Sequence, residues 1–178
     1  MIVERISRSI YLQSPQQSPE ETFEELALAA FAFQFERIAP YRRLCEGRGA
    51  TPASISDWRQ VPMVPAAAFK TLELAAEPAV EVFRSSGTTA GEARSVHHQA
   101  YPDLYRQVID ASFPGFCLPL GAPAPMLSLV PTREQLPDSS LSFMIDHVLA
   151  LWGAPESATA FGPRGVELAK ARSWAGQS

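Results

Sequence analysis

Apolar residues recur at helical spacing in the stretch that follows Ser18. The members of this apolar face are Phe23, Leu26, Ala27, Ala30 and Phe31. Ser18 is a suitable N-cap, Pro19 fits the first helical position, and Glu21 has the place of a capping-box acid. Because the residue before a proline resists helical geometry, we expect one helix over residues 18–39 that stops at Pro40.

The middle of the chain alternates between apolar and polar residues in two short stretches. Residues 80–83 predict a strand, and residues 94–98 predict a second strand that pairs back with it. Together they predict a strand–loop–strand hairpin. Residues 47–65 are rich in turn formers and prolines, so we expect an irregular segment there, followed by one or two helical turns at 66–70.

Two helices are expected in the second half of the chain. Residues 103–113 predict a helix that ends at Pro114. A second helix is expected to begin at a cap, Asp138 or Ser139, and to end at Gly153. Its apolar stripe consists of Leu141, Met144, Ile145, Val148, Leu149 and Trp152.

The apolar run 126–130, bounded by prolines, predicts a buried strand ahead of that second helix. Strand and helix form the opening of a β–α–β unit, which indicates the α/β class. The parallel strand that would complete the unit is not evident before Ser178, although a helix is expected near 166–172. We therefore expect a helical and irregular segment at 1–78 and a partial, incomplete α/β region at 79–178.

Composition narrows the functional classes. Nineteen acidic and fifteen basic residues give a net charge of −4 without a block of like charge, so we expect no nucleic-acid partner. Cys45 and Cys117 stand far apart, which argues against a zinc site or a disulfide scaffold; we expect both to be small buried residues. The charged N-terminus is unlike a signal peptide, and no apolar run has the length of a membrane span. A cytoplasmic location is the resulting expectation.

The loop between the two predicted strands, residues 85–91, reads Ser-Ser-Gly-Thr-Thr-Ala-Gly. Gly87 and Gly91 permit backbone turns that other residues resist. Inward-turned backbone N–H groups bind anions, and nearby hydroxyls add hydrogen bonds to phosphate oxygens. Neither the Walker pattern nor the Rossmann fingerprint matches, and the same composition suits an ordinary hairpin turn. The loop alone therefore leaves two interpretations, a phosphate-binding site or a plain turn.

The order of residues in this loop resembles the phosphate-binding signature of the adenylate-forming ligases, such as acyl-CoA synthetases and phenylacetate–CoA ligases. The surroundings resemble, more particularly, the LuxE-type acyl-protein synthetases. The segments that carry the resemblance are Val64-Pro65, Phe69-Lys70, Phe83-Arg84-Ser85-Ser86-Gly87-Thr88-Thr89, Arg94-Ser95, and Pro137-Asp138-Ser139-Ser140-Leu141 with Met144-Ile145. The resemblance covers roughly residues 23–152.

This resemblance implies ATP-dependent activation of a carboxylic or fatty acid. The acid would attack the α-phosphate to give an acyl-adenylate and pyrophosphate, and the acyl group would pass to a thiol of a protein cysteine or of coenzyme A. The implied phosphate-binding residues are Ser85, Ser86, Gly87, Thr88, Thr89 and Gly91, with Mg²⁺ sharing the phosphate charge. Arg94 stands in for the basic residue that closes the family signature, and His97 is the second candidate catalytic residue.

The sequence departs from the family pattern at Ala90 and at the closing basic residue, which aligns with Arg94 only after a shift, and it also lacks the family's later motifs. Ala90 stands where the signature usually has glycine. The family's later aromatic-Gly-x-Thr-Glu segment, its ribose-binding aspartate and its C-terminal lysine are not found in this sequence. We therefore expect an N-terminal helical segment followed by the first, incomplete part of a ligase-like N-terminal domain, which a further segment or a second chain would complete. The alternatives are a noncatalytic relative that binds or regulates a partner, and a stand-alone binder of nucleotide phosphates.

The histidines also have plain structural interpretations. His97 and His98 lie on the second predicted strand, whose alternation directs them to opposite faces. One of them would face the nucleotide or acyl site, or both are ordinary half-buried histidines. His147 falls off the apolar stripe of its helix, so we expect it in solvent. Lys70 is expected at the end of a short helix, with a substrate-site role as the alternative.

Overall fold

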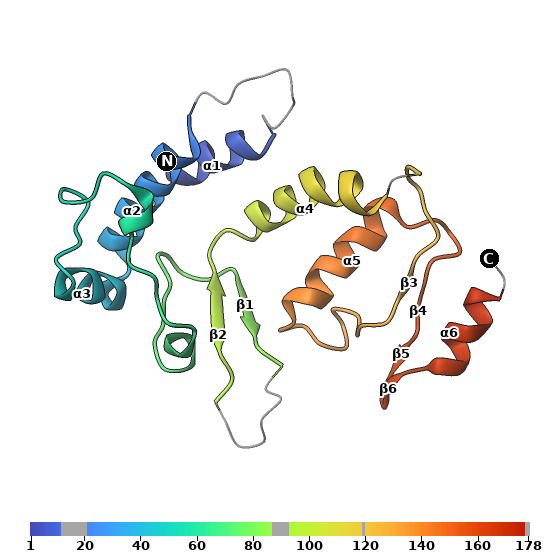
Figure 1. The fold of residues 1–178 in the computed structure, drawn as a ribbon. Helices are drawn as coiled ribbons and strands as arrows, with labels where there is room; N and C mark the ends of the chain where they lie inside the picture. The colour runs from blue at the N-terminus through green and yellow to red at the C-terminus, as the bar shows by residue number, and fades with distance from the viewer. Residues whose placement is uncertain (12–20, 87–92, 119, 177–178) are drawn as a thin grey trace. The chain divides into compact units, whose positions relative to one another are not determined.

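The computed structural model describes residues 1–11, 21–86, 93–118 and 120–176. The described chain combines helices with small two-stranded sheets, which agrees with the expected α/β class at this level (Figure 1). It forms two compact units, Met1–Gln107 and Val108–Ser178.

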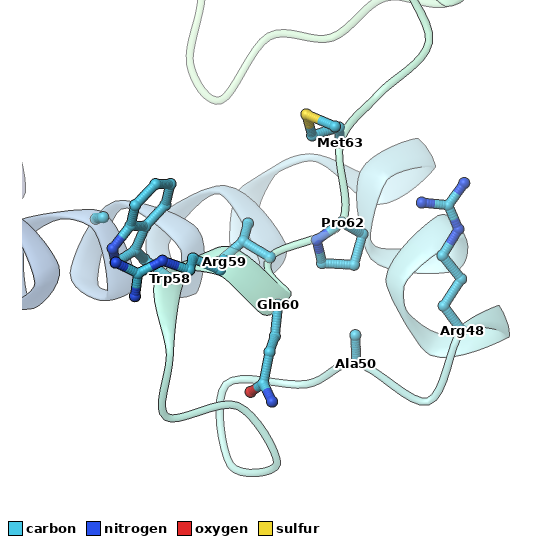
Figure 2. Close-up of a pocket in the computed structure, with 9 residues that line it drawn as sticks. Arg48, Ala50, Trp58, Arg59, Gln60, Pro62 and Met63 are labelled. Carbon is cyan, nitrogen blue, oxygen red and sulfur yellow. The ribbon is translucent and has the colours of Figure 1, made fainter.

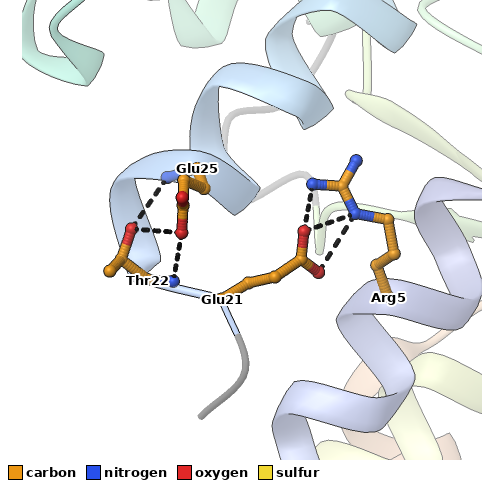
Figure 3. Close-up of polar contacts among 4 residues, drawn as sticks. All are labelled: Arg5, Glu21, Thr22 and Glu25. Carbon is orange, nitrogen blue, oxygen red and sulfur yellow. Dashed lines mark hydrogen bonds and ion pairs between the residues drawn. The ribbon is translucent and has the colours of Figure 1, made fainter.

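The first unit begins with helices α1 (Ile2–Tyr11) and α2 (Phe23–Arg37). Thr22 caps α2 in a capping box: its hydroxyl accepts from the Glu25 N–H, and the Glu25 carboxylate accepts from the Thr22 N–H at 2.7 Å (Figure 3). A capping box was thus the right kind of signal, but the prediction placed it too early. The predicted cap Ser18 lies outside the described residues.

This helix ends close to the predicted position, but the helical structure does not stop at Pro40. Helix α2 ends at Arg37, and Ile38 is at once its C-cap and the N-cap of α3 (Ala39–Gly47). Pro40 lies in the first turn of α3, where the missing N–H of proline has no intrahelical partner to lose. Proline therefore marks the start of a new helix here, which the sequence patterns did not predict.

The core of the first unit lies between α2, α3 and the segment after them. Phe31, Tyr41 and Cys45 are buried, and the rings of Phe31 and Tyr41 meet edge to face at 6.1 Å. The Tyr41 hydroxyl donates to the carbonyl of Pro62 at 3.0 Å. Around this centre pack the partly buried Phe35, Ile38, Leu44, Ile55, Val61 and Val64. The predicted burial of Cys45 is confirmed.

The segment after α3 carries only two short 3-10 helices, η1 (Trp58–Gln60) and η2 (Ala66–Lys70), as the turn-rich composition predicted. Strands β1 (Glu81–Arg84) and β2 (Val96–Gln99) then run side by side and antiparallel (Figure 1). The predicted hairpin is confirmed.

Helix α4 (Pro102–Cys117) is longer than predicted because it passes through Pro114. A proline removes one backbone donor, and the last turn still closes with a hydrogen bond from Leu118 N–H to the Pro114 carbonyl at 3.1 Å. Cys117 is exposed at this end of the helix, so its predicted burial is wrong.

The second unit contains a complete β–α–β unit, contrary to the prediction. Strand β3 (Leu127–Ser128) and strand β4 (Ala158–Thr159) are parallel neighbours joined through α5 (Ser140–Trp152). Hydrogen bonds of 2.9 Å from Ala158 N–H to Met126 and of 2.8 Å from Ala160 N–H to Ser128 extend the pairing. Two-residue strands leave no alternation to detect, which is why the sequence patterns did not reveal β4.

Helix α5 begins and ends as predicted. The Ser139 hydroxyl accepts from the Ser142 N–H at 3.1 Å, and Gly153 is the C-cap. The predicted apolar stripe is wrong in part, because Leu141 is exposed whereas Phe143 is buried. Apolar residues lie nearly all round this helix, so periodicity alone does not select its buried face.

The chain closes with a small hairpin and a helix. Strands β5 (Phe161–Gly162) and β6 (Gly165–Val166) pair antiparallel. Gly165 adopts φ +101°, a conformation that favours glycine. Helix α6 (Leu168–Ala175) follows, close to the helix predicted near 166–172.

Candidate functional site

The neck of the β1–β2 hairpin is the described part of the candidate phosphate site. Beyond the last ladder pair, Arg84 opposite Val96, the Ser85 N–H donates to the Ser95 carbonyl at 3.0 Å. The Ser95 N–H donates to the Ser85 hydroxyl oxygen, also at 3.0 Å. Ser85 therefore closes the neck with both its backbone and its side chain.

Two arginines stand at the base of the loop. Arg94 donates from Nε to the Ser85 carbonyl at 2.5 Å and from a terminal nitrogen to the Arg84 carbonyl at 3.4 Å. Arg84 and Ser86 are exposed. Arg84 and Arg94 thus belong to the segments that enter and leave the loop.

The described residues include only the start of the predicted phosphate loop and, beyond its end, Arg94. Gly87, Thr88, Thr89 and Gly91 lie outside the described residues, as does Ala90. Ser85, Ser86 and Arg94 are described, and the neck brings these three together.

His97 and His98 lie on β2 opposite Phe83 and Val82, hence on opposite faces of the hairpin. The His97 ring stacks on Phe69 of η2, with centroids 4.6 Å apart and planes at 27°. His98 Nδ1 is 4.0 Å from a carboxylate oxygen of Glu73. The structure therefore brings together Phe69, which belongs to a segment of the resemblance, and His97, the second candidate catalytic residue, and leaves His97 half-buried against an aromatic ring.

A second feature is an open pocket in the first unit that the sequence patterns did not predict (Figure 2). Its volume is about 700 Å³. Its lining consists of Ala27, Arg48, Ala50, Trp58, Arg59, Gln60, Val61, Pro62 and Met63. Residues 47–65 look like an irregular connection in the sequence. The available signal was the gathering of a tryptophan and two arginines within this proline-rich stretch.

His147 is not in solvent, which corrects the prediction. Its side chain is only 19% exposed, and its Nε2 donates to Oδ1 of Asp110 at 2.7 Å. The same ring meets Trp152 edge to face at 6.4 Å. No sequence motif links Asp110 and His147, since they lie on different helices 37 positions apart.

The two cysteines differ in character. Burial raises the pKa of the Cys45 thiol, and burial also raises the pKa of the neighbouring Tyr41 hydroxyl. A thiol held in its neutral form is a poor nucleophile. Cys45 is therefore a structural residue of the core rather than a candidate nucleophile.

The described residues contain neither a metal-binding cluster nor a membrane-spanning helix. In the described ranges no three His, Cys, Asp or Glu side chains are grouped so that they could hold a metal ion. No helix in the part of the chain that the structure describes is long and apolar enough to cross a membrane.

No family model, curated protein or solved structure matches this chain. The fold and the site define a protein of helices and small sheets. Its β1–β2 hairpin is closed by Ser85 and has Arg84 and Arg94 on either side of the loop.

Proposed function

We propose that this chain is the N-terminal part of an ATP-dependent acyl-activating ligase of the LuxE type. Its fold would be the first part of a ligase-like N-terminal domain. The reaction would join a carboxylic or fatty acid to AMP with release of pyrophosphate and then transfer the acyl group to a thiol of a protein cysteine or of coenzyme A.

The observation that supports this proposal is the closed neck of the β1–β2 hairpin. Ser85 fixes the neck, Arg84 and Arg94 carry positive charge at its base, and the exposed Ser86 follows directly. A phosphate group is favoured where positive charge and hydrogen-bond donors lie close together. The loop sequence that resembles the family signature begins at this point.

In this proposal the two serines have different tasks. Ser85 holds the loop, since its hydroxyl oxygen already accepts from Ser95. Ser86 donates to a phosphate oxygen, together with Thr88, Thr89 and the backbone at Gly87 and Gly91. Mg²⁺ would be held chiefly by the ATP phosphates and water, as is common for this ion. Arg94 orients the neck rather than reaching the nucleotide, and His97 would line the adjoining face.

The test is Mg-ATP binding by calorimetry, followed by pyrophosphate release with acids from acetate to palmitate. Ser86→Ala and Thr88→Val should each weaken ATP binding by about tenfold, because each removes a hydrogen bond to a charged group. Ser56→Ala, an exposed serine of the same unit, should leave binding unchanged. Carboxylate-dependent pyrophosphate release would support the ligase.

The two alternatives predict other results. Mg-ATP binding without pyrophosphate release would indicate a stand-alone binder of nucleotide phosphates. Absence of Mg-ATP binding would contradict the proposal and favour the noncatalytic, partner-binding relative.

A further inference from the structure

The pocket of the first unit combines a free cation with an apolar floor. Arg48 follows the last residue of α3, and its guanidinium has no hydrogen bond or ion pair with any described residue. The charge of Arg59 is already paired, because a terminal nitrogen of its guanidinium lies 3.3 Å from Oδ1 of Asp57. The guanidinium carbon also lies over the Trp58 ring, 4.9 Å from its centroid. The pocket therefore offers one available positive charge, at Arg48.

The arrangement of these groups suits an elongated ligand. Figure 2 shows Arg48 on one side of the pocket and the stacked Trp58 and Arg59 on the other, with Ala50 and Pro62 between them. A ligand that pairs with Arg48 would cover this apolar floor on its way to Trp58. The Gln60 amide, which also lines the pocket, can both donate to and accept from a peptide group.

The apolar rim of the pocket is exposed to an unusual degree. Met63 is 85% exposed and Trp58 is 37% exposed; Phe23, which is 68% exposed, meets Trp58 edge to face at 5.2 Å. Sites for small molecules are concave and bury most of their ligand. A rim this open instead suits a polypeptide that continues beyond the pocket on both sides.

The side chains at this surface are those that stabilise protein interfaces. Tryptophan, methionine and arginine are enriched in interface cores, and tryptophan and arginine dominate binding hot spots. Charge complementarity further specifies the partner, because an acidic group would be attracted to the exposed guanidinium of Arg48. We infer that this pocket docks an extended segment of a partner protein in which an acidic side chain lies beside a large apolar one. This inference does not depend on the ligase proposal.

The test begins with selection of random twelve-residue peptides displayed on phage against the full chain. Enriched peptides should share an Asp or Glu next to Leu, Ile, Phe or Met. The strongest peptide, labelled with fluorescein, is then titrated by anisotropy against wild type and variants. Arg48→Gln should weaken its binding by about tenfold, as loss of one charged hydrogen bond predicts. Met63→Lys should also weaken the binding. Because the side chains of Arg48 and Met63 are both exposed, we expect both variants to fold.

The matched control is Arg43→Gln, which removes an exposed arginine of α3 outside the pocket lining and should leave the affinity unchanged. A charge exchange sharpens the test: Arg48→Glu should reject the acidic peptide and bind the same peptide with its acid replaced by lysine. The inference is overturned if no peptide is enriched, or if the peptides bind Arg48→Gln as well as wild type.

Other occupants would give other results, each of which also overturns the inference. Binding of octanoate that depends on Arg48, without peptide binding, would indicate a small-molecule site. Self-association in sedimentation velocity that Met63→Lys abolishes would indicate a second copy of this chain.

Discussion

His147 of α5 donates a hydrogen bond from Nε2 to Oδ1 of Asp110 in α4, across 2.7 Å. One turn further along α4, the ring of Phe113 stacks on Trp152 with centroids 5.6 Å apart and planes at 13°. The polar contact and the aromatic contact together fasten the C-terminal half of α4 to α5. The contact between these two helices is therefore both polar and apolar.

Asp110→Asn and His147→Gln, made singly and together, should reveal a coupling of about 1 kcal/mol in the free energy of unfolding, because a half-buried hydrogen bond to a carboxylate is lost. Urea unfolding measures the coupling. The control is the solvent-exposed ion pair of Asp103 and Arg106 within α4, in which a guanidinium nitrogen lies 2.7 Å from Oδ1. This pair should give a coupling of no more than about 0.5 kcal/mol. Equal couplings for the two pairs would contradict the assigned difference in burial.

Thr22→Ala should destabilise α2 by about 1 kcal/mol, since the Glu25 N–H loses its capping acceptor and the capping box is broken. Hydrogen exchange of the first turn of α2 would report the loss directly. Glu24→Gln is the control: Glu24 lies in the same turn but outside the box, so this variant should change the exchange much less. Equal effects of the two variants would show that charge near the helix end, rather than the cap, stabilises this turn.

The ion pair between Arg5 and Glu21, which joins α1 to the start of α2 (Figure 3), should make this contact sensitive to acid. The hydrogen bonds from Arg5 hold the pKa of Glu21 below its ordinary value of 4.5. A carboxylate with a lowered folded pKa contributes stability above its unfolded pKa and loses it as the pH falls through the folded pKa. The contact should therefore be intact at neutral pH and weaken below pH 4.5.

Carbon-13 NMR titration of the carboxyl groups checks this assignment. In Arg5→Gln the pKa of Glu21 should rise toward its ordinary value. The pKa of Glu4, which the N-terminal ammonium lowers first of all, should stay where it is. An unchanged Glu21 pKa in Arg5→Gln would contradict the pairing.

Local chemistry accounts for the features that could be predicted from this sequence. The Ser139 cap, the Gly153 end of α5 and the β1–β2 hairpin depend on residues close together in the chain, and their signals were correct. The start of α2 was misplaced because two capping signals stand within a few residues of each other. In such a case, tertiary contacts rather than propensity decide which one is used.

Features that join distant segments could not be predicted. Strand β4 owes its existence to pairing with β3, because two residues carry no periodic signal of their own. Asp110 and His147 meet only because α4 and α5 pack together, and the pocket around Arg48 and Trp58 forms only where the chain folds back beside α2. In the candidate phosphate site, sequence suggested the chemistry of the loop, but only the structure assigned Ser85 and Arg94 to the neck.

Gly153→Ala should destabilise the second unit by about 1–3 kcal/mol, as overpacking against a fixed neighbour does. A Cβ at this position would lie 2.5 Å from the backbone carbonyl oxygen of Leu149, which cannot move without distorting the last turn of α5. Thermal unfolding measures the change. The control is Gly47→Ala, where the added Cβ meets nothing within 4 Å apart from its chain neighbours and the backbone of its own helix, and this variant should not destabilise the protein through a clash.

Tyr41→Phe should cost about 1–2 kcal/mol even though it keeps the ring that packs against Phe31, because the buried carbonyl of Pro62 loses its donor. Pro62 lines the pocket, so the loss should also loosen the pocket wall and speed hydrogen exchange in residues 58–64. Urea unfolding and exchange mass spectrometry measure the two effects. Phe35→Leu, a change of partly buried apolar volume near the same core, is the comparison: it should lower stability without a selective rise in exchange at 58–64. If Tyr41→Phe left both stability and exchange unchanged, the hydrogen bond to Pro62 would have no part in holding the pocket.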